Sequence, residues 1–396
     1  MVIWIALVTS LLLLLVISQR NLALGMFVAA TVLGLSTLSL GGFFGQIEVT
    51  FSDPSVVSLA GLVGIIAMVG GVLEESGEME NLVKNMRIGK RPFLGASPAL
   101  LGMLPMPGGA LLSAPMVESS AEELEGSTKA VINVWFRHIL FMIYPLAPAL
   151  IASAKIANLN VYDTIPYLAP FFLVSVLIGY FFLLRETRTE MQYSEEFSLR
   201  GLLVPLGVIL LAPVVDIALK SLFNIPVPEY TTLVGVVLSF AAALIVTRYG
   251  FTDLVQVAKK MKPWEFTLIV LGMFTFLNVF KVSGAPKLIA DLNFPLPVLL
   301  VGVAFSLGLV TGRIQAPVSI IFPIFFVRQG VDTIPLLAFA IVYFSVFIGY
   351  AISPIHPCVS VSIEYFDSSV GEYVKKIVPI AVISLVIVGI LSVFLL

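Results

Sequence analysis

The chain of 396 residues is 59% hydrophobic and only 12% charged, with a mean hydropathy of +1.07 and a formal net charge of −2. Soluble domains carry about 25% charged residues, so the composition excludes a soluble globular protein and indicates a multi-pass membrane protein. The charge balance gives no support for nucleic-acid binding, which needs a basic face. The single cysteine, Cys358, excludes an intrachain disulfide and any zinc or iron–sulfur site built on cysteines.

Ten apolar segments are long enough to span a bilayer, which takes about 20 residues. The first of them lacks a basic leader and an Ala-x-Ala-like cleavage site, so we interpret it as a retained helix rather than a signal peptide. In chain order the predicted spans are 2–18, 22–42, 54–73, 130–154, 163–184, 199–222, 229–247, 263–282, 335–364 and 373–396.

Two further apolar segments, 93–118 and 295–328, are interrupted at their middle by Gly, Pro and polar residues. Their central sequences are LGMLPMPGGALLSAPM (101–116) and LGLVTGRIQAPVSIIFPI (307–324). Each segment is long enough for two short helices, which predicts a re-entrant hairpin that enters and leaves the bilayer by the same face. A single kinked span is the alternative. The cluster of Pro105, Pro107, Gly108 and Gly109 favours a turn over a kink.

Each predicted hairpin is followed by a broken span, interrupted by Tyr-Pro-Leu-Ala-Pro at 144–148 and by Ser-Pro-Ile-His-Pro at 353–357. The chain therefore divides into two halves, 1–190 and 198–396, that repeat three spans, a hairpin, a broken span and a last span. Five crossings per half make the second half inverted relative to the first. Interrupted helices at matching positions of two halves indicate a transport site, because freed backbone groups are tolerated at membrane depth only beside a cavity or protein partners.

The basic residues support this topology independently, because cytoplasmic loops carry the excess of Lys and Arg. With both termini outside the cell, the inner face holds fifteen of the 22 basic residues, the outer face holds five, and Arg137 and Arg313 lie within membrane elements. The inner set is Arg20, Lys84, Arg87, Lys90, Arg91, Lys129, Arg185, Arg188, Arg200, Arg248, Lys259, Lys260, Lys262, Lys375 and Lys376, and the outer set is Lys155, Lys220, Lys281, Lys287 and Arg328. We therefore predict a multi-pass protein of the cytoplasmic (inner) membrane.

Segments 75–91 and 283–292 lie between the third span and the hairpin of each half. In the first, Met79, Leu82, Val83 and Met86 are spaced to form one apolar face, which predicts an interfacial amphipathic helix. A solvated loop fits the pattern equally well. In an elevator-type carrier, such helices would join a fixed scaffold to a moving unit.

This layout resembles the ion transporter superfamily of secondary carriers, which includes divalent-anion/sodium symporters, citrate carriers and gluconate permeases. The resemblance covers essentially the whole chain and rests on the repeat layout. It implies an all-α elevator-type carrier, with a scaffold from residues 2–73 and 199–282, a transport unit of hairpins and broken helices, and a homodimer. The tips, Met-Pro-Gly-Gly and Gly-Arg-Ile-Gln-Ala-Pro, differ from the Ser-Asn-Thr motifs of the dicarboxylate/sodium branch. The chain is therefore placed in a separate, uncharacterised branch.

The hairpin tips are the first candidate binding elements. The second arm of each hairpin begins at Pro107–Ala110 and at Gln315–Val318, and a helix N-terminus offers unpaired N–H groups and partial positive charge to an anion. Glycines at the first tip let the backbone approach a ligand closely, or else only permit tight packing. We predict that substrate contacts come from Pro107, Gly108, Gly109, Ser113, Thr311, Gly312, Arg313, Gln315, Ser319, Ser353, His356 and Ser360.

Arg313 lies at the second tip, in an otherwise uncharged stretch between Asp291 and Arg328. An arginine at membrane depth costs about 2.5–3.5 kcal/mol on insertion scales. A carboxylate substrate would pair with it through a bidentate contact; bonding to backbone carbonyls or snorkelling to the outer face are the alternatives. His356, inside the second break, either binds substrate, carries a proton or satisfies a freed carbonyl. Asn133, Arg137 and His138 precede the first break, and for Arg137 and His138 we expect an interfacial or scaffold role.

The coupling ion is open between Na⁺ and H⁺, with no other cofactor expected. Asp216 is the main acidic residue within a span, and it belongs to a predicted scaffold helix. The sequence therefore offers no obvious buried carboxylate to carry a proton, and proton coupling would depend on His356. A sodium ion would be held by oxygen ligands near Met106, Gly108, Tyr144, Pro145, Ala316 and Ser353. The leading hypothesis is a secondary active transporter of a small organic anion. The alternatives are a membrane-embedded enzyme using His356, Cys358 or serines, and an anion channel. The sequence contains no HExxH or GxSxG motif that would favour the enzyme.

Overall fold

The computed structural model describes residues 1–106, 109–187, 193 and 196–395, and every regular element in these ranges is a helix. Seven helices there are long and apolar enough to cross a membrane. They are Pro54–Glu75, Val161–Leu184, Leu199–Leu222, Glu229–Thr247, Pro263–Val282, Leu336–Tyr365 and Val370–Leu395, with shorter apolar helices at Val2–Ser18, Leu22–Thr37 and Val298–Thr311. Large apolar side chains such as Leu12 on the first helix and Val386 on the last are exposed, as expected for a lipid-facing surface.

The first half of the chain contains α1 (Val2–Ser18), α2 (Leu22–Thr37), α3 (Leu40–Ser52), α4 (Pro54–Glu75), α5 (Glu78–Lys84), α6 (Lys90–Gly102), α7 (Gly109–Ser120), α8 (Gly126–Ile139), the short η1 (Leu140–Met142), α9 (Pro148–Ile156), α10 (Val161–Gly179) and η2 (Tyr180–Leu184). The second half contains α11 (Leu199–Leu222), α12 (Glu229–Thr247), α13 (Phe251–Met261), α14 (Pro263–Val282), α15 (Ala285–Ala290), η3 (Val298–Val303), α16 (Ala304–Thr311), α17 (Gln315–Gln329), α18 (Leu336–Ile352), α19 (Pro357–Tyr365) and α20 (Val370–Leu395).

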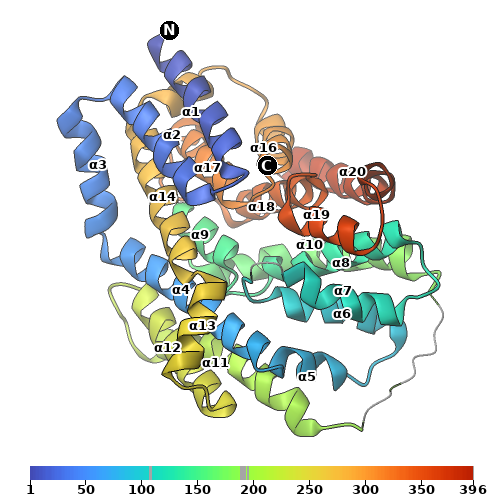
Figure 1. Cartoon of the computed structure of the whole chain (residues 1–396). Coiled ribbons are helices and arrows are strands. Elements are labelled where there is room, and N and C mark those ends of the chain that lie inside the picture. The colour runs from blue at the N-terminus through green and yellow to red at the C-terminus, as the bar shows by residue number, and fades with distance from the viewer. Residues whose placement is uncertain (107–108, 188–192, 194–195, 396) are drawn as a thin grey trace.

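The helices form two groups (Figure 1). In the first group α1 packs on α2, α11 packs on α12, and α2, α4, α12 and α14 pack against one another across the two halves of the sequence. The second group contains α6–α10 and α16–α20. Its contacts between halves include two reciprocal pairs: α7 packs on α19 and α17 on α9, while α8 packs on α20 and α18 on α10. The helix α8 also packs on α19.

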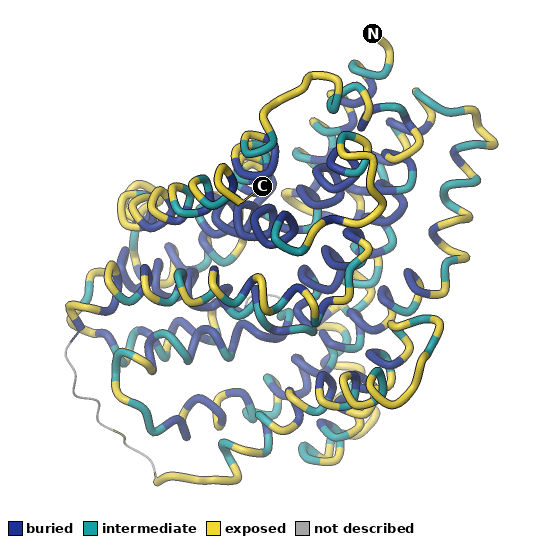
Figure 2. Tube along the Cα trace, turned by 180° about the vertical axis from the view of Figure 1, so that it is seen from behind, coloured by how far each residue is buried: buried dark blue, intermediate teal, exposed yellow. Residues whose placement is uncertain are grey.

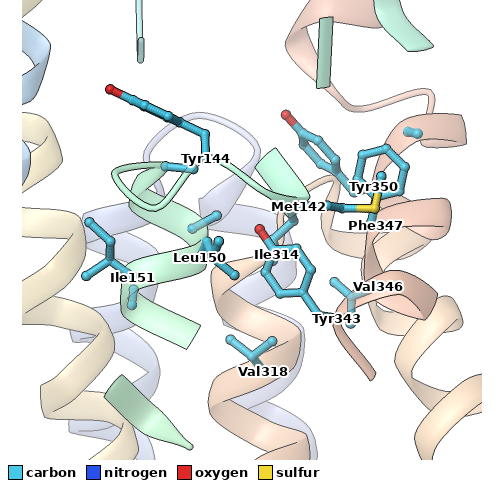
Figure 3. Packing of buried hydrophobic residues seen from close by; sticks show 14 of the residues in the cluster. Met142, Tyr144, Leu150, Ile151, Ile314, Val318, Tyr343, Val346, Phe347 and Tyr350 are labelled. Carbon is cyan, nitrogen blue, oxygen red and sulfur yellow. The ribbon is translucent and has the colours of Figure 1, made fainter. Parts of the chain in front are cut away.

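The interior of the second group is built on α8 and α18, which are buried along nearly their whole length (Figure 2). Trp135 of α8 is fully buried, and its indole N–H donates to the carbonyl of Ser175 at 3.0 Å. Figure 3 shows Leu150 of α9, Ile314 before α17 and Tyr343 of α18 gathered in one apolar cluster. This packing joins the two halves of the chain at the level of the helix breaks.

Both segments predicted as hairpins contain two helices that pack on each other, α6 with α7 and α16 with α17. Both broken spans are interrupted as predicted, after α8 and after α18. Re-entrance of the hairpins in a bilayer stays a prediction. Segment 75–91 contains the short helix α5. The residues Met79, Leu82 and Val83 of its predicted apolar face are buried.

The predicted span 22–42 is too long. α2 ends at Thr37, and a separate, largely exposed helix α3 follows because Ser39 accepts a hydrogen bond from the Gly42 N–H at 3.1 Å and starts a new helix. Asp53 then caps α4 by accepting from the Ser55 N–H at 2.8 Å. The sequence prediction also missed α13, which packs on α4 where Gly71 leaves room for Met261.

Asp216 of α11 is fully buried and completely paired. Its carboxylate accepts hydrogen bonds from Tyr162, Thr231 and Thr232 at 2.6–3.0 Å and forms an ion pair with Lys220 at 2.9 Å. These partners come from α10, α11 and α12, so the residue ties the two helix groups together.

Candidate functional site

A cavity of about 400 Å³ lies where the two interhelical turns meet the two helix breaks. The first turn contributes Leu104, Pro105 and Met106, and the second contributes Arg313. The ends of the broken helices contribute Arg137, His138, Tyr350, His356 and Cys358. The complete lining is Arg20, Asn21, Leu22, Ala23, Gly102, Leu104, Pro105, Met106, Arg137, His138, Phe141, Glu265, Phe266, Ile269, Arg313, Tyr350, His356, Pro357 and Cys358.

Arg137 is the most deeply buried cation of this cavity, with 4% of its surface exposed. Two glycines of the first hairpin make room for it. A Cβ at Gly102 would stand 2.0 Å from the Arg137 carbonyl oxygen, and a Cβ at Gly109 would stand 2.0 Å from its Nη2 atom. The guanidinium also donates through Nη1 to the Ser113 hydroxyl at 3.3 Å. The hairpin thus fixes the position of the charge.

A hydrogen-bond network behind Arg137 joins α7, α8 and α19. The Ser113 hydroxyl donates to Asn133 Oδ1 at 2.6 Å, while Asn133 Nδ2 donates to the Ala110 carbonyl at 3.0 Å and to the Ser362 hydroxyl at 2.9 Å. Asn133 and both serines are fully buried. A buried network with every amide atom paired fixes one arrangement of these three helices.

The second turn rests on the second helix break. Gly312 has a left-handed backbone (φ +56°), and a Cβ there would lie 3.1 Å from the backbone nitrogen of His356. The Ser353 hydroxyl donates to the Leu309 carbonyl at 2.6 Å, and the Thr311 hydroxyl donates to the Leu307 carbonyl at 2.7 Å. Because these contacts fix the turn, the partly exposed Arg313 side chain is held at the cavity wall.

Aromatic rings cover the wall between the two arginines. The ring of His356 lies 4.0 Å from Tyr350 and 4.7 Å from His138, measured between centroids. Both histidines are 2% exposed. His138 Nδ1 lies 2.7 Å from the Val134 carbonyl, whereas His356 Nδ1 has no hydrogen-bond partner. His356 therefore keeps an unused polar atom inside the protein.

The first group of helices contributes the start of α2, at residues 20–23, and the start of α14, at residues 265–269. The corresponding contact of the first break is closed. Tyr144 and Leu146 meet Ile209 of α11 and Ser239 of α12 around a void of only about 10 Å³. The Tyr144 ring points away from the other labelled residues of the cluster (Figure 3), and its hydroxyl donates to the Ile209 carbonyl at 3.3 Å.

Of the residues predicted to bind substrate, Arg313 and His356 line the cavity, and Gly109 contacts it through Arg137. Ser113, Thr311, Gly312 and Ser353 lie in the supporting contacts described above. Ser319 is buried and bonds to its own helix, Gln315 is half-buried at the start of α17, and Ser360 is exposed. Pro107 and Gly108 lie outside the described residues.

The predicted sodium ligands are divided. Met106 lines the cavity, whereas Tyr144 lies in the closed contact and Ser353 bonds to Leu309. Pro145 is half-buried and Ala316 is fully buried. A sodium site among these residues stays a prediction.

The interfacial or scaffold role expected for Arg137 and His138 is wrong. α8 begins at Gly126, four residues before the predicted span, and ends at Ile139, so both residues lie at its inner end beside the break. The sequence held a usable signal: Asn133 and Arg137 are four residues apart and therefore share one face of the helix. That polar face continues with Lys129, which points to a helix buried on a polar partner rather than one anchored at an interface.

The fold and this cavity define a multi-pass helical membrane protein with a basic chamber between interrupted helices. A family model described as "Protein of unknown function (DUF401)" matches residues 2–395, and the chain belongs to this family. The fold is similar to the crystal structure of the Alcanivorax borkumensis YdaH transporter, with a TM-score of 0.62, 16% sequence identity, and coverage of 94% of this chain and 97% of that chain. No curated protein matches the sequence significantly.

Proposed function

We propose that this protein is a secondary active transporter of a small organic anion with a carboxylate group, and that the chamber is its substrate site. The observation that carries the proposal is that Arg137 and Arg313, two of the three arginines in the lining, face one cavity from the two interrupted regions. Among the described residues no carboxylate lies within ion-pair distance of either guanidinium. Glu265 is the only acid of the lining and pairs with Lys262 at 3.4 Å. A substrate carboxylate would supply the missing counter-charge.

The size and character of the chamber fit such a ligand. Small-molecule sites are clefts of about 300–1,000 Å³ with a few fixed polar groups and apolar or aromatic walls. Here the volume is about 400 Å³, and Phe141, Phe266 and Tyr350 lie beside the charged and polar groups. A compact organic acid would leave water in only part of this space.

The proposed mechanism is alternating access between two inverted halves. The same order of elements occurs in both, including the short helices α5 and α15 and the two interrupted pairs. The reciprocal contacts of α7 with α19 and α17 with α9 support a pseudo-twofold relation. We propose that the first helix group is the scaffold and the second is the moving transport unit of an elevator.

The structure then corresponds to an inward-open state. Arg20 and Glu265, which line the cavity, belong to the face that the basic residues assign to the cytoplasm, and the equivalent contact around Tyr144 is closed. Movement of the transport unit would close the cytoplasmic side of the chamber and open the contact around Tyr144. Coupling to Na⁺ or H⁺, both termini outside, and a homodimer held through the scaffold remain parts of the proposal.

The experiment is substrate discovery followed by uptake. Purified protein is screened by thermal shift against organic acids with and without Na⁺, and acids that stabilise it are tested for uptake in proteoliposomes under Na⁺ or H⁺ gradients. We expect saturable, gradient-dependent uptake. Arg313→Ala should abolish it, and Arg313→Lys should weaken it because the bidentate contact is lost. Arg200→Ala, at an exposed arginine outside the cavity, is the matched control.

Three results would contradict the proposal. These are a screen in which no anion stabilises the protein, an Arg313→Ala variant that transports like the unchanged protein, and a flux that does not saturate and ignores the gradient. The last would indicate a channel.

A further inference from the structure

Three potential metal ligands meet in the wall of the chamber. One ligand atom each from His138, His356 and Cys358 lie within 4.8 Å of one another. His138 lies in the last turn of α8, His356 directly precedes α19, and Cys358 is the second residue of α19, so the cluster joins the two interrupted helices. Nothing in the anion site described above requires two imidazoles and a thiol at one point.

His138 is arranged as a metal ligand usually is, and His356 has a ring nitrogen without a partner. A ligating imidazole donates its other N–H to a carbonyl or carboxylate, which fixes the tautomer. His138 Nδ1 faces the Val134 carbonyl at 2.7 Å, which leaves the Nε2 lone pair free. The His356 Nδ1 is buried without a partner. An unpaired buried polar atom is costly, and a metal ion would pair it.

Cys358 is placed where its sulfur can meet an ion in the chamber. It is the second residue of α19, where the helix dipole favours negative charge. The Arg137 guanidinium lines the same cavity. Cys358 is half-buried and lines the cavity, so an ion entering the chamber reaches it directly.

We propose that His138, His356 and Cys358 form a binding site for a thiophilic transition-metal ion of the Zn²⁺ class, with its fourth position open to the chamber. Tetrahedral zinc with bonds of about 2.0–2.3 Å sets its ligands about 3.3–3.6 Å apart, so the side chains need to close by about 1 Å. Arg137 and Arg313 oppose a bare dication, and the thiolate offsets one charge. An anion at the fourth position, held by the same arginines, offsets more; this last feature alone rests on the proposed function.

The test uses Co²⁺, whose spectrum reports its ligands. Tag-free full-length protein in detergent is titrated with Co²⁺ in chloride and then in acetate. We expect one ion per chain, tetrahedral d–d bands and a thiolate-to-cobalt charge-transfer band, all displaced by Zn²⁺. The chain has one cysteine, so Cys358→Ser must remove the charge-transfer band. His138→Gln and His356→Gln should each weaken binding by more than about tenfold.

The double variant Cys358→Ser/Ser221→Cys is the control, because it keeps one thiol per chain at an exposed position of α11. It should not restore the band. Absence of Co²⁺ binding, an octahedral spectrum without thiolate, or binding unchanged in Cys358→Ser would each overturn the metal site. Arg313→Ala protein should still give the thiolate band, so failure of anion transport and failure of metal binding are separate results.

Discussion

The guanidinium of Arg137 occupies the space that a side chain at Gly109 would fill. The Nη2 atom lies 2.0 Å from the position of a Cβ there, and the helix beginning at Gly109 is the second arm of the first hairpin. The hairpin tip therefore holds the most deeply buried charge of the chamber. Movement of the tip and placement of the charge are coupled through this contact and through the hydrogen bond of Arg137 to Ser113.

Gly109→Ala is expected to displace the Arg137 side chain and to weaken anion binding by about tenfold or more, since a shifted guanidinium loses bidentate geometry. The measurement is anion affinity by thermal shift or uptake. Gly207→Ala in α11 is the control, because a Cβ there meets no atom within 4 Å. Equal affinity in both variants would show that Arg137 does not contact the anion.

Asn133 provides a second test, which separates structure from charge. Asn133→Ala removes the hydrogen-bond partner of buried groups in Ser113, Ala110 and Ser362. Each group left unpaired lowers the free energy of unfolding by about 1–3 kcal/mol. Asn133→Asp keeps the shape but adds a carboxylate behind Arg137. We expect lower thermal stability in both variants, and in the aspartate variant also a loss of anion affinity beyond that of the alanine variant.

The comparison variant is Asn278→Ala, which removes one hydrogen bond to Thr50, at 3.0 Å, away from the chamber. It should lower stability less and leave anion affinity unchanged. If Asn133→Asp binds anions as tightly as the unchanged protein, the counter-charge role of Arg137 is wrong.

Composition and interruption patterns were enough to predict the helical membrane fold, both two-helix turns and both breaks. The fold, the turns and the breaks depend on local chemistry, because the length of an apolar segment determines the spans and Pro and Gly determine the interruptions. The position of Arg137 could not be obtained in that way, because its burial depends on Gly102 and Gly109 packing on α8. The prediction missed α3 and α13 because caps and packing determine where such short helices form on the surface of a helix group. Ser39 caps α3, and Met261 of α13 packs on Gly71.

The topology predicts that both ends of the first hairpin face the cytoplasm. In a Cys358→Ser background, cysteines at the exposed positions Gly89 and Glu122, before α6 and after α7, should react with a membrane-impermeant maleimide only in inside-out vesicles. Lys259→Cys and Lys287→Cys, on either side of α14, serve as inner and outer references. Labelling of positions 89 and 122 from opposite sides would mean that residues 93–118 cross the bilayer, and the inverted repeat would be rejected.

Elevator motion predicts that contacts between the two helix groups must break during transport. Lys155 at the end of α9 pairs with Glu229 at the start of α12 at 3.2 Å, on the side where the chamber is closed. In a Cys358→Ser background, joining cysteines at these positions with a short reducible thiol cross-linker should block uptake, and reduction should restore it. Lys129 and Glu118, paired at 2.7 Å between α8 and α7, lie within the proposed moving unit, so the same cross-link there should leave uptake intact. Full transport with positions 155 and 229 joined would show that the two groups do not separate, and access to the chamber would then have to change by local movement of the tips.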